Sequence, residues 1–374
     1  MSNTSDRVRV THLIHDLGPG GAEHVLVDLA TVAEAAGIDM SVVSMLPLGR
    51  FRYPRLLRES GVRVESLDLA AWWDPRGPRR LRRLLAALAP EILHSHLKHA
   101  DVVAGRVARP AGILQVSTLH VVEDSVGPLG AWKRGIAMRW RKRTARRTIA
   151  VSDALRDWYL AESGADPDSV VTIRNGVPDP VGIDREEVSA VRRELGIGDD
   201  RIVALTIAVM RPGKGHDVLL DAVKEVDDDR LVFLLAGDGS EAKRLWARAA
   251  GDHRIVFTGF REDVPLLFAA ADLVVHPSLG DALPTSLIHA LAAGLPIVAS
   301  DIGGIPEIVT PGAGFLVPPG DPAALASAIT RLAADEAGRR LMEKRSRERF
   351  EEEFEAAAWA RRLRSLYSEV LNRT

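Results

Sequence analysis

Short apolar segments alternate with amphipathic helical segments along the second half of this 374-residue chain. Strands are expected at residues 202–209, 231–235, 255–257, 273–275 and 297–299, with helices at 215–226, 241–250, 264–270 and 284–293. Strands that alternate with helices pair in parallel through right-handed crossovers. The pattern therefore predicts a doubly wound α/β domain.

The first half of the chain shows the same alternation. Strands are expected there at residues 8–14, 40–46, 62–69, 92–95, 113–119, 148–151 and 170–173. From residue 178 to about 198 the chain is rich in Pro, Gly, Asp and Arg, which is typical of a domain boundary. We therefore expect one domain over residues 1–178, a second over residues 179–354, and a last helix in residues 355–374 that packs back on the first domain.

Composition excludes several classes of site. The chain has no cysteine, which removes disulfides, thiolate zinc sites and cysteine nucleophiles. No apolar run approaches the roughly 18 residues that a membrane-spanning helix needs, and the first residues lead into a strand, so the cytoplasm is the expected compartment. Residues 1–180 carry 25 basic and 20 acidic side chains, or +5, and the remainder carries 24 and 31, or −7. The basic half is expected to lie near an anionic partner.

The segment from residue 276 to residue 307 has the features of a ligand-binding edge. A buried strand ends at its start, a polar loop follows, and Pro284 suits the first position of a helix with Thr285 in its first turn. The unpaired amides at that helix terminus favour an anion, and Gly303 with Gly304 allows backbone to approach a ligand closely. This order of elements is typical of the ligand edge of an open α/β sheet.

A glycine turn joins the first predicted strand to the helix that follows it. Gly18, Gly20 and Gly21 make this turn, and bare backbone at a helix N-terminus is a phosphate-binding device. A plain tight turn between strand and helix explains the same local pattern equally well.

Four histidines of the first half are candidates for a functional site. His94, His96 and His99 suggest a metal site, but no carboxylate pattern completes it, so a buried or capping role is favoured. His120 stands at the C-terminal tip of a strand, where α/β sheets place functional groups. For this lone histidine a functional and a structural role are equally supported.

A strongly basic helix is predicted over residues 131–147, which contain eight basic residues and no acidic one. Trp132, Ile136 and Trp140 share one stripe, and Arg141 is among the cations spread over the rest. Two interpretations fit equally: the helix lies on an anionic membrane surface, or it has a solvated face with its tryptophans in the core.

Taken together, these segments make the chain resemble the retaining glycosyltransferases of family 4. The resemblance covers nearly the whole chain and rests on the order and spacing of blocks that include GPGGAEHVLVDLA, TLHVVED, RPGKGHDVLLDA, LLAGDGS and LIHALAAGLPIVASDIGGIPEIV. It implies the GT-B fold, in which two Rossmann-like domains with doubly wound parallel sheets face each other across a cleft.

The resemblance also implies roles for individual residues. His120 corresponds to the histidine near the donor sugar, and Lys214 to the lysine that neutralises the diphosphate as a point charge. Gly20 and Gly21 correspond to the loop that faces the diphosphate. The implied donor-binding set further includes Gly237, Gly239, Arg261, Val264, Leu283, Pro284, Thr285 and His289.

Three positions depart from the family pattern. Asp281 and His289 stand where the family has two glutamates, eight positions apart, of which the first contacts the donor sugar and the second the ribose. Asp281 keeps the charge with a shorter reach, whereas a neutral imidazole at His289 offers one donor and one acceptor. Val209 stands where the family has an arginine, and Arg211 is the candidate substitute. A helix histidine without a ligand is the alternative for His289.

The resemblance implies transfer of a sugar, with retention, from a nucleotide-sugar donor to an acceptor hydroxyl bound by the first domain. A UDP-sugar is the default donor, and no metal or cofactor is implied, because Lys214 and Arg211 supply the positive charge. The acceptor is left open among a carbohydrate, a lipid-linked molecule at the inner face of the membrane and a small molecule. Nucleic acid is not an expected partner. Two other functions stay open: a non-catalytic sugar-nucleotide-binding subunit and a sugar-nucleotide epimerase of related fold.

Overall fold

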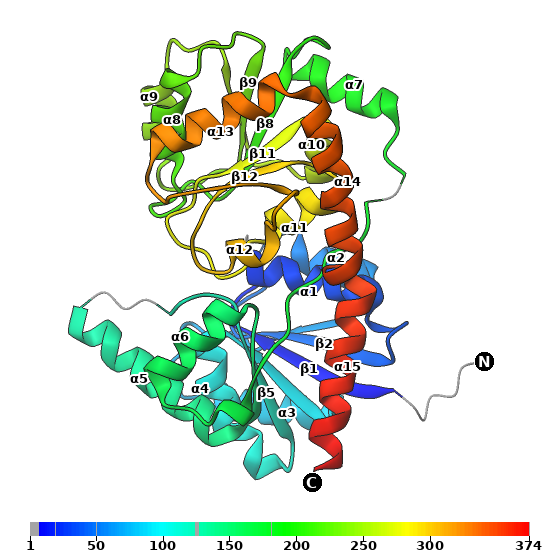
Figure 1. Ribbon diagram of the computed structural model, residues 1–374. Helices are drawn as coiled ribbons and strands as arrows, with labels where there is room; N and C mark the ends of the chain where they lie inside the picture. Colours follow the sequence, from blue (N-terminus) through cyan, green and yellow to red (C-terminus); the bar gives the residue numbers. More distant parts are fainter. Residues whose placement is uncertain (1–6, 19, 50, 124–126, 181, 374) are drawn as a thin grey trace. The chain divides into compact units, whose positions relative to one another are not determined.

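The computed structural model describes residues 7–18, 20–49, 51–123, 127–180 and 182–373. Its contacts divide the chain into two compact units (Figure 1). The first unit consists of Met1–Pro178 together with Glu355–Thr374, and the second of Asp179–Phe354. Each unit is built on its own parallel sheet, so the predicted α/β class is confirmed. Among the described residues, no helix has the length and apolar character needed to cross a bilayer.

The first unit contains a seven-stranded parallel sheet in the order β3-β2-β1-β4-β5-β6-β7. The strand order reverses between β1 and β4, and ligands of doubly wound sheets bind outside the carboxyl ends of the strands at such a switch point. The strands are β1 (Val8–Ile14), β2 (Ile38–Ser44), β3 (Arg63–Ser66), β4 (Ile92–His96), β5 (Leu114–Leu119), β6 (Ala145–Ala150) and β7 (Val170–Thr172).

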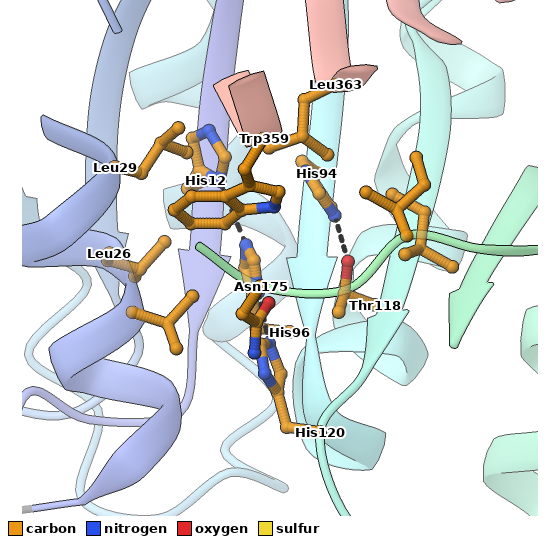
Figure 2. Close-up of a pocket in the computed structure, with 13 residues that line it drawn as sticks. His12, Leu26, Leu29, His94, His96, Thr118, His120, Asn175, Trp359 and Leu363 are labelled. Carbon is orange, nitrogen blue, oxygen red and sulfur yellow. Dashed lines mark hydrogen bonds between the residues drawn. The ribbon is translucent and has the colours of Figure 1, made fainter. Parts of the chain in front are cut away.

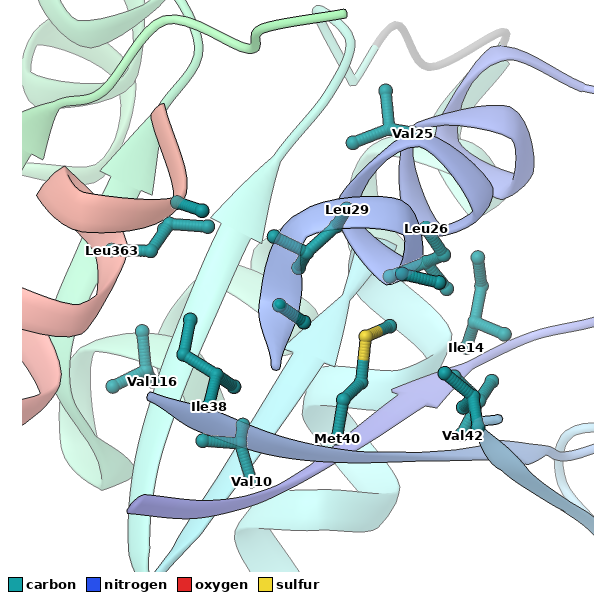
Figure 3. Close-up of a cluster of buried hydrophobic side chains, with 14 of the residues drawn as sticks. Val10, Ile14, Val25, Leu26, Leu29, Ile38, Met40, Val42, Val116 and Leu363 are labelled. Atoms are coloured by element: carbon teal, nitrogen blue, oxygen red, sulfur yellow. The ribbon is translucent and has the colours of Figure 1, made fainter. Parts of the chain in front are cut away.

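Helices pack on both faces of the first sheet. Apolar residues of α1, α2 and α15 form one core with Val10 and Met40 of the strands, part of which is drawn in Figure 3. On the other face, α3 and α4 pack with Leu13 and Leu93. The last helix contacts α1 and β1, and its Leu363 lies in the first core. The helices are α1 (Gly21–Ala33), α2 (Tyr53–Glu59), α3 (Gly77–Leu88), α4 (Leu97–Val107), α5 (Gly127–Thr144), α6 (Asp153–Ser163) and α15 (Ala356–Asn372).

The second unit repeats this topology with a six-stranded parallel sheet in the order β10-β9-β8-β11-β12-β13. Its switch point lies between β8 and β11. The strands are β8 (Ile202–Ile207), β9 (Leu231–Ala236), β10 (Ile255–Gly259), β11 (Leu273–His276), β12 (Ile297–Ser300) and β13 (Gly314–Val317). The helices are α7 (Arg185–Glu194), α8 (His216–Glu225), α9 (Ala242–Ala249), α10 (Val264–Ala269), α11 (Thr285–Ala292), α12 (Ile305–Ile308), α13 (Pro322–Ala334) and α14 (Glu336–Glu353).

Several elements differ from the sequence predictions. The basic helix ends at Thr144, because the next residues join the sheet: Ala145 of β6 pairs with Gln115 of β5. Pro284 precedes α11 as an extended residue, with φ −69° and ψ 115°, so it is not the first helical residue. The sequence analysis predicted neither β13 nor α4. Four residues are too few to give β13 a periodic pattern.

Candidate functional site

Two loops meet at the switch point of the second sheet. The loop after β8 carries Lys214, and the loop after β11 carries Asp281, whose carboxylate oxygens accept hydrogen bonds from Lys214 Nζ at 2.8 and 2.7 Å. The two side chains are largely buried, with 14% and 15% of their surface exposed. Partial removal from water strengthens such a pair relative to a surface ion pair. The structure thus brings two predicted catalytic residues into direct contact.

His276 adds a third polar group, and we call Lys214, Asp281 and His276 the charged cluster. His276 ends β11, is buried, and its Nε2 lies 2.9 Å from Asp281 Oδ2. Burial opposes ionisation of Asp281, but the hydrogen bond with His276 and the charge of Lys214 hold its pKa below the ordinary value. Burial, together with the nearby His276, lowers the pKa of His216 to about 4. No role was predicted for His276, although a polar residue that ends a buried strand beside a polar loop is a signal visible in the sequence.

Glycine backbone brings the loops of this cluster together. Gly215 has φ 71°, and a Cβ there would lie 1.7 Å from the carbonyl oxygen of Pro277. Gly303 has φ 57°, and a Cβ there would lie 2.0 Å from the carbonyl oxygen of Asp281. The same oxygen accepts a hydrogen bond from the Gly304 N–H at 3.2 Å. Gly303 and Gly304 therefore pack against the backbone of Asp281 and fix where its carboxylate lies, and their predicted approach to a ligand stays a prediction.

Other donor-binding candidates of the second unit lie in varied environments. Arg211 is exposed, and 44% of the Val209 surface is exposed. Arg261 forms ion pairs with Asp263 and Glu194, each at 2.5 Å, and these carboxylates raise the pKa of its guanidinium. The charge of Arg261 is thus already compensated by two carboxylates of the protein, and its predicted donor-binding role stays a prediction.

The remaining candidates follow the carboxyl ends of β9, β10 and β11. Leu283 and Pro284 are buried, Thr285 begins α11, and the ring of His289 on that helix lies 6.0 Å from the Phe268 ring. Gly237 and Gly239 follow β9 and Val264 begins α10. The placement of these residues at one sheet edge agrees with a ligand site there, and their individual roles stay predictions.

In the first unit, the glycine turn leads directly into α1. Gly20 is the extended residue before the helix and Gly21 is its first residue. The carboxylate of Glu23 lies over this turn, since a Cβ on Gly20 would be 2.1 Å from Glu23 Oε2. Burial raises the pKa of Glu23 to about 7, against the hydrogen bond with its own backbone N–H and with a further contribution from Asp16. An acidic side chain of the protein therefore lies at the helix terminus for which the sequence suggested a phosphate.

Three histidines form hydrogen bonds through the first sheet, and we call His12, His96 and His120 the histidine chain (Figure 2). His120 follows β5, and its Nε2 lies 2.8 Å from His96 Nδ1; His96 Nε2 lies 2.9 Å from His12 Nδ1. His12 and His96 are buried at the switch point between β1 and β4. Burial lowers the pKa of His120 to about 4, and burial with the charge of His120 lowers the pKa of His12 to about 3.

His94 lies beside the histidine chain without belonging to it. Its Nδ1 is 2.7 Å from the Tyr367 hydroxyl and its Nε2 is 2.7 Å from the Thr118 hydroxyl. The predicted burial of His94 and His96 is confirmed, and their rings stack with centroids 4.4 Å apart. His12, His94 and His96 are close enough to hold a metal ion. Since both nitrogens of His94 and of His96 are already hydrogen-bonded, a metal would have to displace those bonds.

The basic helix α5 contains one residue that the sequence analysis misplaced. Arg141 is completely buried, and its guanidinium contacts Asp101 at 2.5 Å and Glu123 at 2.8 Å. The prediction that Arg141 belongs to a solvated cationic face is therefore wrong, because two acidic residues distant in sequence provide its partners. Trp132 is 63% exposed and Trp140 is half-buried beneath the guanidinium of Arg106, so the two tryptophans of the stripe lie in different environments.

Comparisons of the sequence with known families match both units. Residues 19–179 match the model described as Glycosyltransferase Family 4, and residues 201–335 match the model described as Glycosyl transferases group 1. The chain is 30% identical to the alpha-maltose-1-phosphate synthase of Mycobacterium tuberculosis, over 97% of this chain and all of that protein. It is 29% identical to the phosphatidyl-myo-inositol mannosyltransferase of Mycobacterium leprae, over 84% of each chain.

Comparison with solved structures supports the same fold. HepE of Anabaena, in complex with UDP and glucose, matches 97% of this chain and 100% of its own with a TM-score of 0.84 at 23% identity. The lipopolysaccharide glycosyltransferase WaaG matches 96% of this chain and 99% of its own with a TM-score of 0.73 at 15% identity. Two Rossmann-like units of this topology make the fold GT-B. The matched family models, the full-length relatives and the fold agree, and the chain belongs to glycosyltransferase family 4.

Proposed function

We propose that this glycosyltransferase moves a sugar from a UDP-sugar donor to an acceptor hydroxyl, with retention of configuration and without a metal or other cofactor. The observation that carries the proposal is the position of Lys214, paired with Asp281 at the switch point of the second sheet. Ligands of doubly wound sheets bind at this edge. A cation there can compensate the negative charge that develops on a diphosphate leaving group. HepE, which shares the fold, has been solved with UDP and glucose.

The chemistry asked of Lys214 is electrostatic. An ammonium group has three N–H donors, and Asp281 accepts from Lys214 through both of its oxygens, so the lysine keeps donor capacity for a phosphate oxygen. Asp281 holds the ammonium in place, and His276 holds Asp281. This preorganisation lets Lys214 stabilise charge that grows on the diphosphate as the sugar leaves, without reorganising at that moment. Exposed Arg211 is the second cation proposed for the same role.

In the proposed reaction, the bond between the anomeric carbon and the diphosphate oxygen breaks, and the acceptor oxygen bonds to the same face of that carbon. The acceptor proton passes to a diphosphate oxygen, so no nucleophile of the enzyme is needed. The family resemblance assigns His120 and Asp281 to the transferred sugar and His289 to the ribose. A neutral imidazole at His289 can satisfy fewer ribose hydroxyl groups than a carboxylate, so we expect weak nucleotide binding.

A thermal-shift screen of UDP-, GDP- and ADP-sugars, followed by a transfer and hydrolysis assay with the stabilising donor, tests the proposal. A bound donor stabilises the fold by mass action, by about 2.7 kcal/mol at 100 times its Kd. We expect stabilisation by a UDP-sugar and release of UDP when an acceptor is present. Stabilisation without transfer or hydrolysis would favour a non-catalytic sugar-nucleotide-binding subunit. The observation behind this alternative is that His289 and the exposed Val209 replace charged residues of the family. A converted sugar nucleotide without any acceptor would indicate an epimerase.

We also propose that α5 contacts an anionic membrane surface, which would place a lipid-linked acceptor near the first unit. The helix carries exposed Trp132, and its cations Lys133, Arg139 and Arg143 are exposed as well. Each cation near an anionic surface contributes about 1 kcal/mol at most, and salt screens this attraction. Flotation with anionic liposomes at low salt should recover the protein, and Trp132→Ala should weaken recovery. Absence of the protein from the vesicle fraction at low salt would contradict this part of the proposal.

A further inference from the structure

The two hydrogen bonds of the histidine chain constrain where its protons lie. Three neutral imidazoles carry three N–H protons, one on each ring. The His12–His96 bond uses one proton and the His96–His120 bond uses another. The third proton must then lie at one end of the chain, either on His12 Nε2 or on His120 Nδ1. These two arrangements exclude each other, because choosing one end fixes the tautomer of every ring.

The surroundings of His12 distinguish the two ends. His12 Nε2 is buried and has no hydrogen-bond partner among the residues that the structure describes. His12 lies among Leu26, Leu29 and Trp359 in the pocket of Figure 2, whose volume is about 10 Å³. A cavity of this size is at the lower limit for one water molecule. Orphaned buried N–H groups are rarer than under-satisfied acceptors, so the proton is disfavoured at this end.

Neutrality of the three rings is a premise of this count, and their environment supports it. Burial lowers the pKa of His12 to about 3 and that of His120 to about 4, and it holds the pKa of His96 well below the ordinary value. Each ring also lies within 5.2 Å of the next, centroid to centroid, so a charge on one would repel a charge on its neighbour. Near pH 7 each ring therefore carries a single proton.

We propose that His12 and His96 are positioning residues that set the tautomer of His120, so that His120 carries its proton on Nδ1 and presents an N–H donor beyond the end of β5. In this arrangement His12 Nδ1 donates to His96 Nε2, and His96 Nδ1 donates to His120 Nε2. The ligand group that suits such a donor is an oxygen acceptor, and a sugar hydroxyl provides one. This inference rests on the proposed function for the contact of His120 with the transferred sugar.

The neighbouring His94 provides a matched control within the same core. It is as deeply buried as His96 and stacks against it, but its nitrogens bond Tyr367 and Thr118 and not the chain. His94→Leu therefore removes a buried imidazole without breaking either bond of the histidine chain. His96→Leu removes both bonds and leaves His120 Nε2 without its donor.

Nitrogen-15 NMR of histidine-labelled, full-length protein tests the proposal directly, with His12→Leu, His96→Leu and His120→Asn used to assign the signals. We expect wild-type His12, His96 and His120 each to carry the proton on Nδ1 and to show an unprotonated Nε2. In His96→Leu, His120 should populate both tautomers, whereas in His94→Leu it should keep the proton on Nδ1. A protonated Nε2 on His120 in the wild type would overturn the proposal. This wild-type reading needs only the folded His120→Asn variant, which identifies the His120 signals.

Kinetic measurements separate the tautomer assignment from the proposed function. Loss of the fixed donor in His96→Leu should lower kcat/KM about tenfold, which corresponds to one hydrogen bond of about 1.4 kcal/mol, while His94→Leu stays within about threefold of wild type. Wild-type protein without any transfer activity but with the expected tautomers would remove the proposed function and leave the tautomer assignment standing. Transfer activity with the opposite tautomer would do the reverse.

Discussion

The switch points of the two sheets occupy equivalent places in the same topology, yet they hold opposite chemistry. At the second sheet, Lys214 and Asp281 form an ion pair that keeps part of its surface in water. At the first sheet, His12 and His96 are buried, and burial keeps them neutral. The difference shows how burial selects the form of a polar group: a charge persists where a counter-charge stabilises it, and a buried titratable ring without a counter-charge stays neutral.

Arg141 tests whether buried charges of the first unit depend on their counter-charges. Arg141→Met should destabilise the protein by about 3 to 5 kcal/mol, because it leaves Asp101 and Glu123 buried without a cation. Arg143→Met, the same substitution at an exposed site of the same helix, should change stability by less than about 0.5 kcal/mol. Chemical denaturation measures both. Equal stability of the two variants would show that burial does not set the behaviour of charge here.

Lys214 tests whether the charge at the second sheet serves transfer. Lys214→Ala should lower kcat by about 10² to 10³-fold, the range for loss of one preorganised electrostatic contact. Circular dichroism should show an intact fold, and Lys224→Ala, at an exposed lysine of the same unit, should keep normal turnover. Near-normal transfer by Lys214→Ala would remove the central assignment.

The pH dependence of protein stability tests whether Asp281 is ionised and paired in the charged cluster. The pKa of Asp281 is lowered in the folded protein, so its ionised form contributes stability above the unfolded value near 4, and this stability is lost as pH falls through the folded pKa. Asp281→Asn should be less stable than wild type by about 2 kcal/mol at pH 7, the range for a hydrogen bond to a charged group. Thermal unfolding should show this gap shrinking below about pH 4. A gap that stays constant down to pH 3 would contradict ionic pairing.

Glu23 should show the opposite pH dependence of stability, since burial raises the pKa of this carboxyl group to about 7. The protonated form is then favoured by folding, and the associated stability is complete below the unfolded value and is lost as pH rises through 7. Glu23→Gln should therefore gain stability relative to wild type between pH 5 and pH 8, by about 2 to 3 kcal/mol. If the stability difference between the two proteins is the same at pH 5 and pH 8, folding does not shift the pKa of this carboxyl group.

The sequence predicted the parallel sheets, the loop edges and the family, because these depend on local patterns. Lys214 was assigned to the donor diphosphate from the order of blocks around it, and this role stays a prediction. Contacts between distant segments were not predictable in this way. The partners of Arg141 come from α4 and from the loop after β5, and the Tyr367 hydroxyl that meets His94 comes from the far end of the chain. The close approach of Gly303 to the Asp281 backbone was likewise not predictable, because the position of a glycine in the sequence does not say which group approaches it.

The alternation of apolar strands and amphipathic helices by itself determined that this protein has two doubly wound parallel sheets, because the side-chain period decides which face of each element is buried. Only the tertiary structure decided which polar residues share a site. Lys214 lies 67 positions from Asp281, and His12 lies 84 positions from His96. Such groups meet only when the sheet is assembled, and the desolvation that assembly imposes then determines which of them stay charged.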